Sequence, residues 1–142
     1  MATGFQVTFD ASDPQRLAEF WAEALQYVVQ PPPPDYDTWE EFAVAMGIPE
    51  DEWGRLAAIV DPAEEGPRVL FQRVPETKTS KNRVHLDVNV GAGHEPEKRR
   101  TIVAAESERL GALGAVTIRT HDEGHEYWIV MRDPEGNEFC LQ

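Results

Sequence analysis

The clearest pattern of polar and apolar residues along the chain lies in the segment 83–90. Valine and leucine alternate there with Arg83, His85, Asp87 and Asn89. Because successive side chains of a strand point to opposite faces, this alternation predicts a strand with one apolar face and one face that carries a cation, an imidazole and a carboxylate. Such groups are costly to bury unless they are paired. The segment is therefore the first place to look for a functional site.

The residues before this segment predict one strand, one helix and then three further strands. An alternating strand at 5–10 is followed by Asp13 and Pro14, which are typical of the residue before a helix and of its first position. Apolar residues at helical spacing then form a single stripe. The other predictions for this half are strands at 27–30, 55–60 and 68–74, a turn at 61–66, and a short amphipathic helix over 39–46 that ends at Gly47.

The same order of elements returns in the second half of the chain. The strand at 83–90 is followed by a charged helix over 97–110, which Gly111 and Gly114 are expected to end. The buried side of this helix should contain Ile102, Val103 and Leu110. Strands are predicted at 115–120, 126–132 and 138–142, with a turn at 133–137.

The repeated order predicts a single α+β domain, residues 1–142, built from two βαβββ modules at about residues 4–75 and 81–142. We expect their half-sheets to form one cup-shaped mixed sheet, with the polar faces turned inward. The chain has 142 residues, of which 41% are hydrophobic, so a core can form.

The charge and cysteine content restrict the class of partner. A formal net charge of -13 disfavours nucleic acid and anionic membranes as partners. No apolar run approaches the roughly 20 residues that span a bilayer, and the first residues do not resemble a signal sequence. Cys140 is the single cysteine and has no partner for an internal disulfide. We therefore expect a cytoplasmic protein.

Four groups of residues together resemble the vicinal oxygen chelate superfamily, which includes glyoxalase I, bleomycin-resistance proteins and extradiol dioxygenases. More narrowly, the chain is similar to the glyoxalase-like domain family. The resemblance extends along the whole chain and implies a ligand site inside the cup. The residues that carry it are Asp13-Pro14 with Phe20-Trp21, residues 71–76 (FQRVPE), Lys78 with residues 81–87 (KNRVHLD), and residues 133–140 (DPEGNEFC).

In metal-using members of the superfamily, four inward side chains hold one divalent ion. The resemblance places Gln6, Gln72, His85 and Cys140 at these positions. Amide oxygens are weak, neutral ligands, and one imidazole with one thiol is an incomplete zinc set. We therefore doubt a tightly held metal. If one binds, the candidate ligands are His85 and Glu138, which shares a face with Cys140.

His85 is the strongest candidate for chemistry. It could act as an acid or base with Asp87, as a metal ligand, or as a group that orients a ligand; a structural imidazole tied to Asp87 or Arg83 is the alternative. His85 and Asp87 stand about 7 Å apart along a strand, so a hydrogen bond requires their side chains to lean together. Arg83 could anchor an anionic group of a substrate or remain a solvated charge.

Other chemically equipped residues have two interpretations each. Cys140 is either an inert buried thiol, the commoner case, or a nucleophile that His85 activates. His121 and His125 stand four residues apart, but Gly124 between them predicts a hairpin loop with solvated histidines.

The aromatic residues are similarly open to two interpretations. Trp39, Phe42 and Trp53 fall in the least regular segment, where they could form a lid over an apolar pocket, or cover a sheet edge or a dimer seam. Trp128 either lines the cup as a ligand-binding residue or faces a helix.

The resemblance implies that the protein binds a small organic molecule in the cup, with lyase, isomerase or dioxygenase-like chemistry. Gln6 and Gln72 would then donate hydrogen bonds to the ligand, with Arg83 or Asp87 orienting it. The alternative is a non-catalytic protein that sequesters a drug or metabolite, as bleomycin-resistance proteins do. The expected partners are a small-molecule ligand and, in a homodimer, a second copy of the chain.

Overall fold

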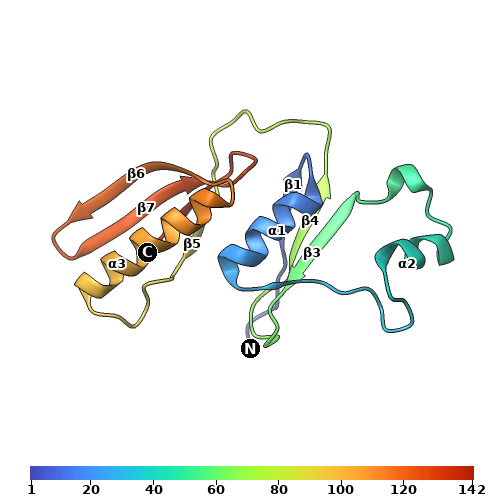
Figure 1. Ribbon diagram of the computed structural model, residues 1–142, viewed down its shortest axis with the longest axis horizontal. Coiled ribbons are helices and arrows are strands. Elements are labelled where there is room, and N and C mark those ends of the chain that lie inside the picture. The colour runs from blue at the N-terminus through green and yellow to red at the C-terminus, as the bar shows by residue number, and fades with distance from the viewer. The chain divides into compact units, whose positions relative to one another are not determined.

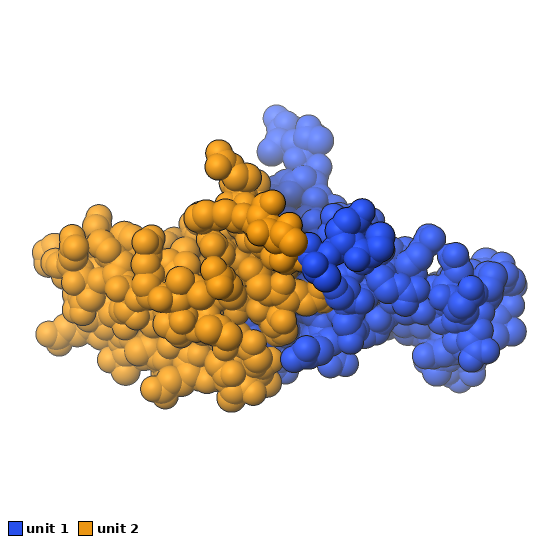
Figure 2. Space-filling view, turned by 90° about the horizontal axis from the view of Figure 1, so that it is seen from above, with its two compact units in different colours: residues 1–77 blue, residues 78–142 orange.

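A computed structural model describes residues 1–142. The chain divides into two compact units (Figure 1). Unit 1 comprises Met1–Thr77 and unit 2 comprises Lys78–Gln142, coloured separately in Figure 2. Each unit contains one four-stranded mixed sheet with a helix packed against it. The predicted α+β class with two βαβββ modules is confirmed.

In unit 1 the strand order is β1-β4-β3-β2; β1 and β4 run parallel, and the other pairs are antiparallel. Helix α1 begins as expected, because the Asp13 carboxylate accepts a hydrogen bond from the Arg16 backbone N–H and Pro14 occupies the first turn. The elements are β1 (Val7–Ala11), α1 (Pro14–Leu25), β2 (Val28–Val29), β3 (Leu56–Val60) and β4 (Val69–Arg73).

The core of unit 1 lies between α1 and one face of this sheet. Leu17 and Trp21 of the helix are fully buried, as are Ile59 and Phe71 of the strands. Phe9 stacks on Phe71 at 5.3 Å between ring centroids. The opposite face of the sheet carries Thr8, Asp10 and Gln72 together with the apolar side chains of Leu56 and Leu70.

Residues 31–55 form an excursion between β2 and β3. It contains helix α2 (Trp39–Ala45) and the 3₁₀ helix η1 (Glu50–Glu52). The predicted short helix is confirmed, and the Thr38 hydroxyl caps it by accepting from the Glu41 N–H. The Trp39 indole donates to the Gln30 carbonyl, and its ring packs edge-on against Phe42 at 5.7 Å. These aromatic residues pack within their own segment.

In unit 2 the strand order is β5-β8-β7-β6, the same pattern as in unit 1. Helix α3 covers one face of the sheet (Figure 1), where Val103 and Leu110 pack in a core with Met131 and Phe139. The elements are β5 (Leu86–Val88), α3 (Pro96–Ala112), β6 (Val116–Glu123), β7 (Glu126–Arg132) and β8 (Glu138–Leu141).

The strand expected at 83–90 is much shorter in the structure. Only Leu86–Val88 pairs with β8, because the ladder ends at Phe139 and leaves residues 83–85 without a partner strand. Val84 is 79% exposed, so it does not belong to the buried face that the alternation predicted. The expectation was wrong for residues 83–85 and for residues 89–90, which also lie outside the strand.

Two other expectations require correction. Strand β6 continues to Glu123, so His121 lies in a strand and not in the hairpin loop; Asp122 and Tyr127 extend the pairing there. Gly111 lies inside α3, whose capping residue is Leu113, so Gly111 does not end the helix. The helices of the structure are all too short or too polar to cross a membrane.

Candidate functional site

The open face of the unit 2 sheet, opposite α3, carries the ionisable side chains that could bind a ligand or transfer protons. Register places Asp87 of β5 beside Cys140 of β8, Cys140 beside Val130 of β7, and Val130 beside Arg119 of β6. The residues next to them along each strand, such as Phe139 in β8, point to the core. Four strands therefore each place a side chain in one row.

This row forms the floor of a depression of about 370 Å³, which we call the sheet hollow. It lies entirely within unit 2. Its lining includes His85, Asp87, Arg119, Trp128, Glu138 and Cys140. A volume of this size is at the lower end of the range for small-molecule sites.

His85 and Asp87 form a direct pair, with 2.9 Å between Nδ1 and Oδ1. A carboxylate can only accept a hydrogen bond, so Nδ1 carries the proton and donates it to Asp87. In the neutral form of the imidazole, this tautomer has its lone pair on Nε2. Both side chains remain partly exposed, at 47% and 44%, so the imidazole can exchange protons with a ligand or with water.

The Cys140 side chain also forms a hydrogen bond with the Asp87 carboxylate. Burial raises the pKa of the Cys140 thiol to about 11, and the charge of Asp87 and a hydrogen bond to its carboxylate act in the same direction. The thiol therefore keeps its proton near neutral pH. The geometry favours the inert thiol over the nucleophile of the two interpretations.

One set of metal-ligating atoms lies in the sheet hollow. The ligand atoms of His85, Asp87 and Cys140 lie within 4.8 Å of one another. One imidazole, one carboxylate and one thiol do not fit Mg²⁺ or Mn²⁺, which prefer oxygen ligands. The set fits Zn²⁺ only if the thiol gives up its proton. Asp87 is a candidate ligand that the sequence analysis did not name.

Glu138 forms an ion pair with Lys81. Its carboxylate lies 2.7 Å from the Lys81 ammonium, and this hydrogen bond lowers the pKa of the Glu138 carboxyl. It lines the hollow but does not belong to the set of ligand atoms around His85.

Arg119 is the functional candidate that sequence reasoning missed. The other charged side chains of the hollow pair with each other, whereas the Arg119 side chain has neither a hydrogen bond nor an ion pair. A register shift between Thr117 and Arg119 decides which face Arg119 occupies, and alternation alone could not reveal this shift. Trp128 lines the hollow and stacks on His121, with 3.7 Å between ring centroids.

The remaining predicted site residues lie elsewhere. Gln6 and Gln72 belong to the open face of the unit 1 sheet. The side-chain oxygen of Gln6 accepts from the Arg68 guanidinium at 2.7 Å, and the side-chain amide of Gln72 donates to the Asp10 carboxylate at 2.8 Å. Trp39 is also in unit 1. Arg83 precedes β5 and does not line the hollow. The expectation that the two glutamines share a cup with His85 stays a prediction.

Comparison with known proteins identifies the family of this chain. The family model for the glyoxalase-like domain matches residues 6–142, which is nearly the whole chain. The chain belongs to the glyoxalase-like domain family. No curated protein matches it.

Solved structures of this superfamily share the fold. A glyoxalase-related enzyme from Fulvimarina pelagi has a TM-score of 0.62 and 17% identity, covering 99% of this chain and 87% of that one. A glyoxalase/bleomycin resistance protein/dioxygenase family enzyme from Burkholderia phytofirmans PsJN has a TM-score of 0.61 and 14% identity, with coverage of 96% and 94%.

A third similar structure contains ligands. The fosfomycin resistance protein FosX from Listeria monocytogenes was solved as a mutant with Mn(II) and 1S,2S-dihydroxypropylphosphonic acid. It has a TM-score of 0.62 and 13% identity, covering 100% of this chain and 90% of that one. At these identities the comparison establishes the fold of this glyoxalase-like protein.

Proposed function

We propose that this glyoxalase-like protein binds a small organic molecule in the sheet hollow of unit 2. One observation carries the proposal: Asp87 of β5, Cys140 of β8 and Arg119 of β6, with His85 just before β5, lie around a single depression on the open face of a sheet. A sheet face that served only as a scaffold would not require this set of groups, since each is costly to desolvate.

The lining indicates the class of ligand. Arg119 supplies a guanidinium without a partner, which can form two parallel hydrogen bonds with a carboxylate. Trp128 supplies an aromatic surface whose orientation is held by its stack on His121. We infer a planar or aromatic molecule that carries a negative charge.

A pair of matched compounds tests this ligand class. Titration calorimetry should show saturable binding of 1-naphthoate and much weaker binding of the uncharged 1-naphthamide. Arg119→Gln should weaken binding of 1-naphthoate by about ten-fold or more, the value of one charged hydrogen bond. Lys98→Gln on the exposed side of α3 makes the same change in net charge and should leave the affinity unchanged. Equal effects of the two variants would contradict the proposal.

A second candidate function is proton transfer on the bound molecule, as in a lyase or isomerase. The observation that favours it is the 2.9 Å bond from His85 to Asp87, because it leaves Nε2 as a proton acceptor and stabilises the imidazolium that would form. Without such chemistry the protein would be a binder that sequesters its ligand.

Hydrogen exchange separates the two functions. Small α-keto acids would be incubated with the protein in D₂O, and loss of the proton next to the carbonyl followed by NMR. Exchange that disappears in His85→Gln, while the ligand still binds, would support proton transfer. Exchange at the same rate in His85→Gln, or no exchange above buffer, would favour the non-catalytic binder.

A further inference from the structure

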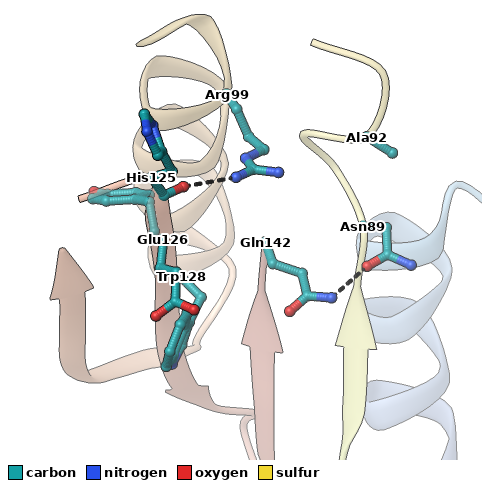
Figure 3. Close-up of a pocket in the computed structure, with 8 residues that line it drawn as sticks. Asn89, Ala92, Arg99, His125, Glu126, Trp128 and Gln142 are labelled. Carbon is teal, nitrogen blue, oxygen red and sulfur yellow. Dashed lines mark hydrogen bonds between the residues drawn. The ribbon is translucent and has the colours of Figure 1, made fainter. Parts of the chain in front are cut away.

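A second pocket of about 300 Å³ lies at the end of the unit 2 sheet, beside the start of α3 (Figure 3). We call it the Arg99 pocket. Residues from the end of β8, the segment after β5, the first turns of α3 and the β6–β7 hairpin surround it. Those used below are Asn89, Arg99, Glu126, Trp128 and Gln142.

Arg99 is held in this pocket with unused hydrogen-bonding capacity. Its Nη2 donates to the His125 carbonyl at 3.0 Å, while its Nε is buried and has no acceptor. In Figure 3 the guanidinium points from α3 into the space between His125 and Ala92, above Gln142 in this view. A buried donor without an acceptor costs free energy, and such groups in a folded protein call for an explanation.

The backbone next to Arg99 leaves room for its side chain. A Cβ at Gly91 would lie 2.1 Å from the Arg99 Cγ and 2.8 Å from its Cδ, which no packed structure tolerates. The Gly91 N–H donates to the Gln142 carbonyl at 2.9 Å, which keeps this backbone in place. Glycine at position 91 is therefore what permits Arg99 to reach the pocket.

The other groups of the pocket leave the guanidinium available. The side-chain amide of Gln142 donates to the side-chain oxygen of Asn89 at 2.8 Å, so each of these side chains already has one hydrogen-bond partner. Glu126 has the one acidic side chain in the lining, and its carboxylate lies 3.4 Å from His121 Nε2. Arg99 is thus the cation of the pocket and lacks an anionic partner.

We propose that the Arg99 pocket is a binding site for the carboxylate or another oxyanion group of a small molecule. The anion accepts from the Nε–H of Arg99, the donor that has no acceptor in the folded chain. This site is distinct from the row of residues around His85. The two adjoin, because Trp128 and Gln142 line both.

Benzoate and its uncharged analogue benzamide test the site. In ¹H–¹⁵N spectra of the full chain, benzoate should shift the Gly91 backbone amide and the Gln142 side-chain amide in a saturable manner, and benzamide should not. Arg99→Gln should weaken benzoate binding by about ten-fold or more. Lys98→Gln is the matched control, since Lys98 is the exposed neighbour of Arg99 on α3 and does not line the pocket, and it should bind as the original protein does.

A second variant guards against a purely structural effect of Arg99. Gly91→Ala keeps the guanidinium but displaces its side chain, and it should weaken benzoate binding while the far-UV spectrum stays unchanged. Unchanged affinity in Arg99→Gln, or no saturable shift in the original protein, would overturn the proposal. Loss of benzoate binding in Arg119→Gln but not in Arg99→Gln would also overturn it and leave the sheet hollow as the ligand site. The reverse result would support the Arg99 pocket and count against the hollow.

Discussion

Units 1 and 2 have the same strand order, but their open sheet faces differ in chemistry. In unit 1, Gln6 and Gln72 are engaged with Arg68 and Asp10 of their own sheet. In unit 2, the corresponding face carries a hydrogen-bonded His85–Asp87 pair beside a hollow. The repeat therefore maintains the scaffold in both units, while the groups suited to acid–base chemistry occur in one of them.

The two units also share a turn. Each has an Asp-Pro pair before a glycine, and the aspartate carboxylate accepts from the backbone N–H two residues later: Asp61 from Ala63 and Asp133 from Glu135, each at 2.9 Å. Asp133 is only 3% exposed and also accepts from the backbone and the side chain of Asn137. The aspartate of this turn is thus half-buried in unit 1 and buried in unit 2.

The largest expected effect follows from this difference. Asp133→Ala should lower the free energy of unfolding by about 2–4 kcal/mol, because it leaves buried N–H groups without an acceptor. Asp61→Ala, whose donors are reached by water, should have a smaller effect. Urea denaturation measures both, with Asp133→Asn as a control that retains one acceptor oxygen. Equal losses for Asp61→Ala and Asp133→Ala would contradict the comparison.

A second prediction concerns the thiol of unit 2. Asp87→Asn removes a charge and a carboxylate acceptor from beside Cys140, so the pKa of the thiol should fall from about 11. Alkylation by iodoacetamide at pH 9 should then become several-fold faster, and Cys140 is the single cysteine to follow. Glu138→Gln, which removes a more weakly coupled charge, should have a smaller effect. An unchanged rate in Asp87→Asn would show that Asp87 does not hold the thiol proton.

The unit 1 turn should produce a smaller effect that depends on pH. Backbone hydrogen bonds from Ala63 and Gly66 lower the pKa of Asp61 below its usual value. A carboxyl with a lowered folded-state pKa stabilises the protein above its unfolded pKa, and this contribution is lost as the pH falls through the folded pKa. Denaturation from pH 7 down to pH 2 should show that the stability advantage over Asp61→Asn narrows in acid. A gap that widens in acid would contradict this assignment.

The smallest expected effect is that of hard divalent ions. Mg²⁺ and Mn²⁺ should leave the melting temperature unchanged, because the donor set at His85, Asp87 and Cys140 contains only one carboxylate. Binding at 100 times the dissociation constant would stabilise the fold by about 2.7 kcal/mol, which is easily detected. A clear rise with Mn²⁺ that His85→Ala abolishes would show that the hollow is a metal site after all.

Much of the fold followed from local signals. The capped start of α1 at Asp13, the short helix α2 and the turn at Asp133 each depend on neighbouring residues, and the structure confirms them. The length of β5 did not follow, because it is set by its partner β8. The strand position of His121 likewise depends on pairing with β7.

The candidate site was only partly accessible from the sequence. His85, Asp87 and Cys140 stood out by residue type, and the structure brings their ligand atoms together. Arg119 and Arg99 did not stand out. The face of Arg119 depends on a register shift, and the buried Nε of Arg99 depends on a glycine eight positions earlier in the chain. Such features arise from tertiary packing, which periodicity does not encode.

The most direct test of the sheet hollow as the ligand site is a ¹H–¹⁵N titration of the full chain with 1-naphthoate. Our account predicts saturable shifts at the amides of β5 and β8 and at the Trp128 indole, with a strong reduction in Arg119→Gln. Shifts confined to the open face of unit 1, around Gln6 and Gln72, would contradict it.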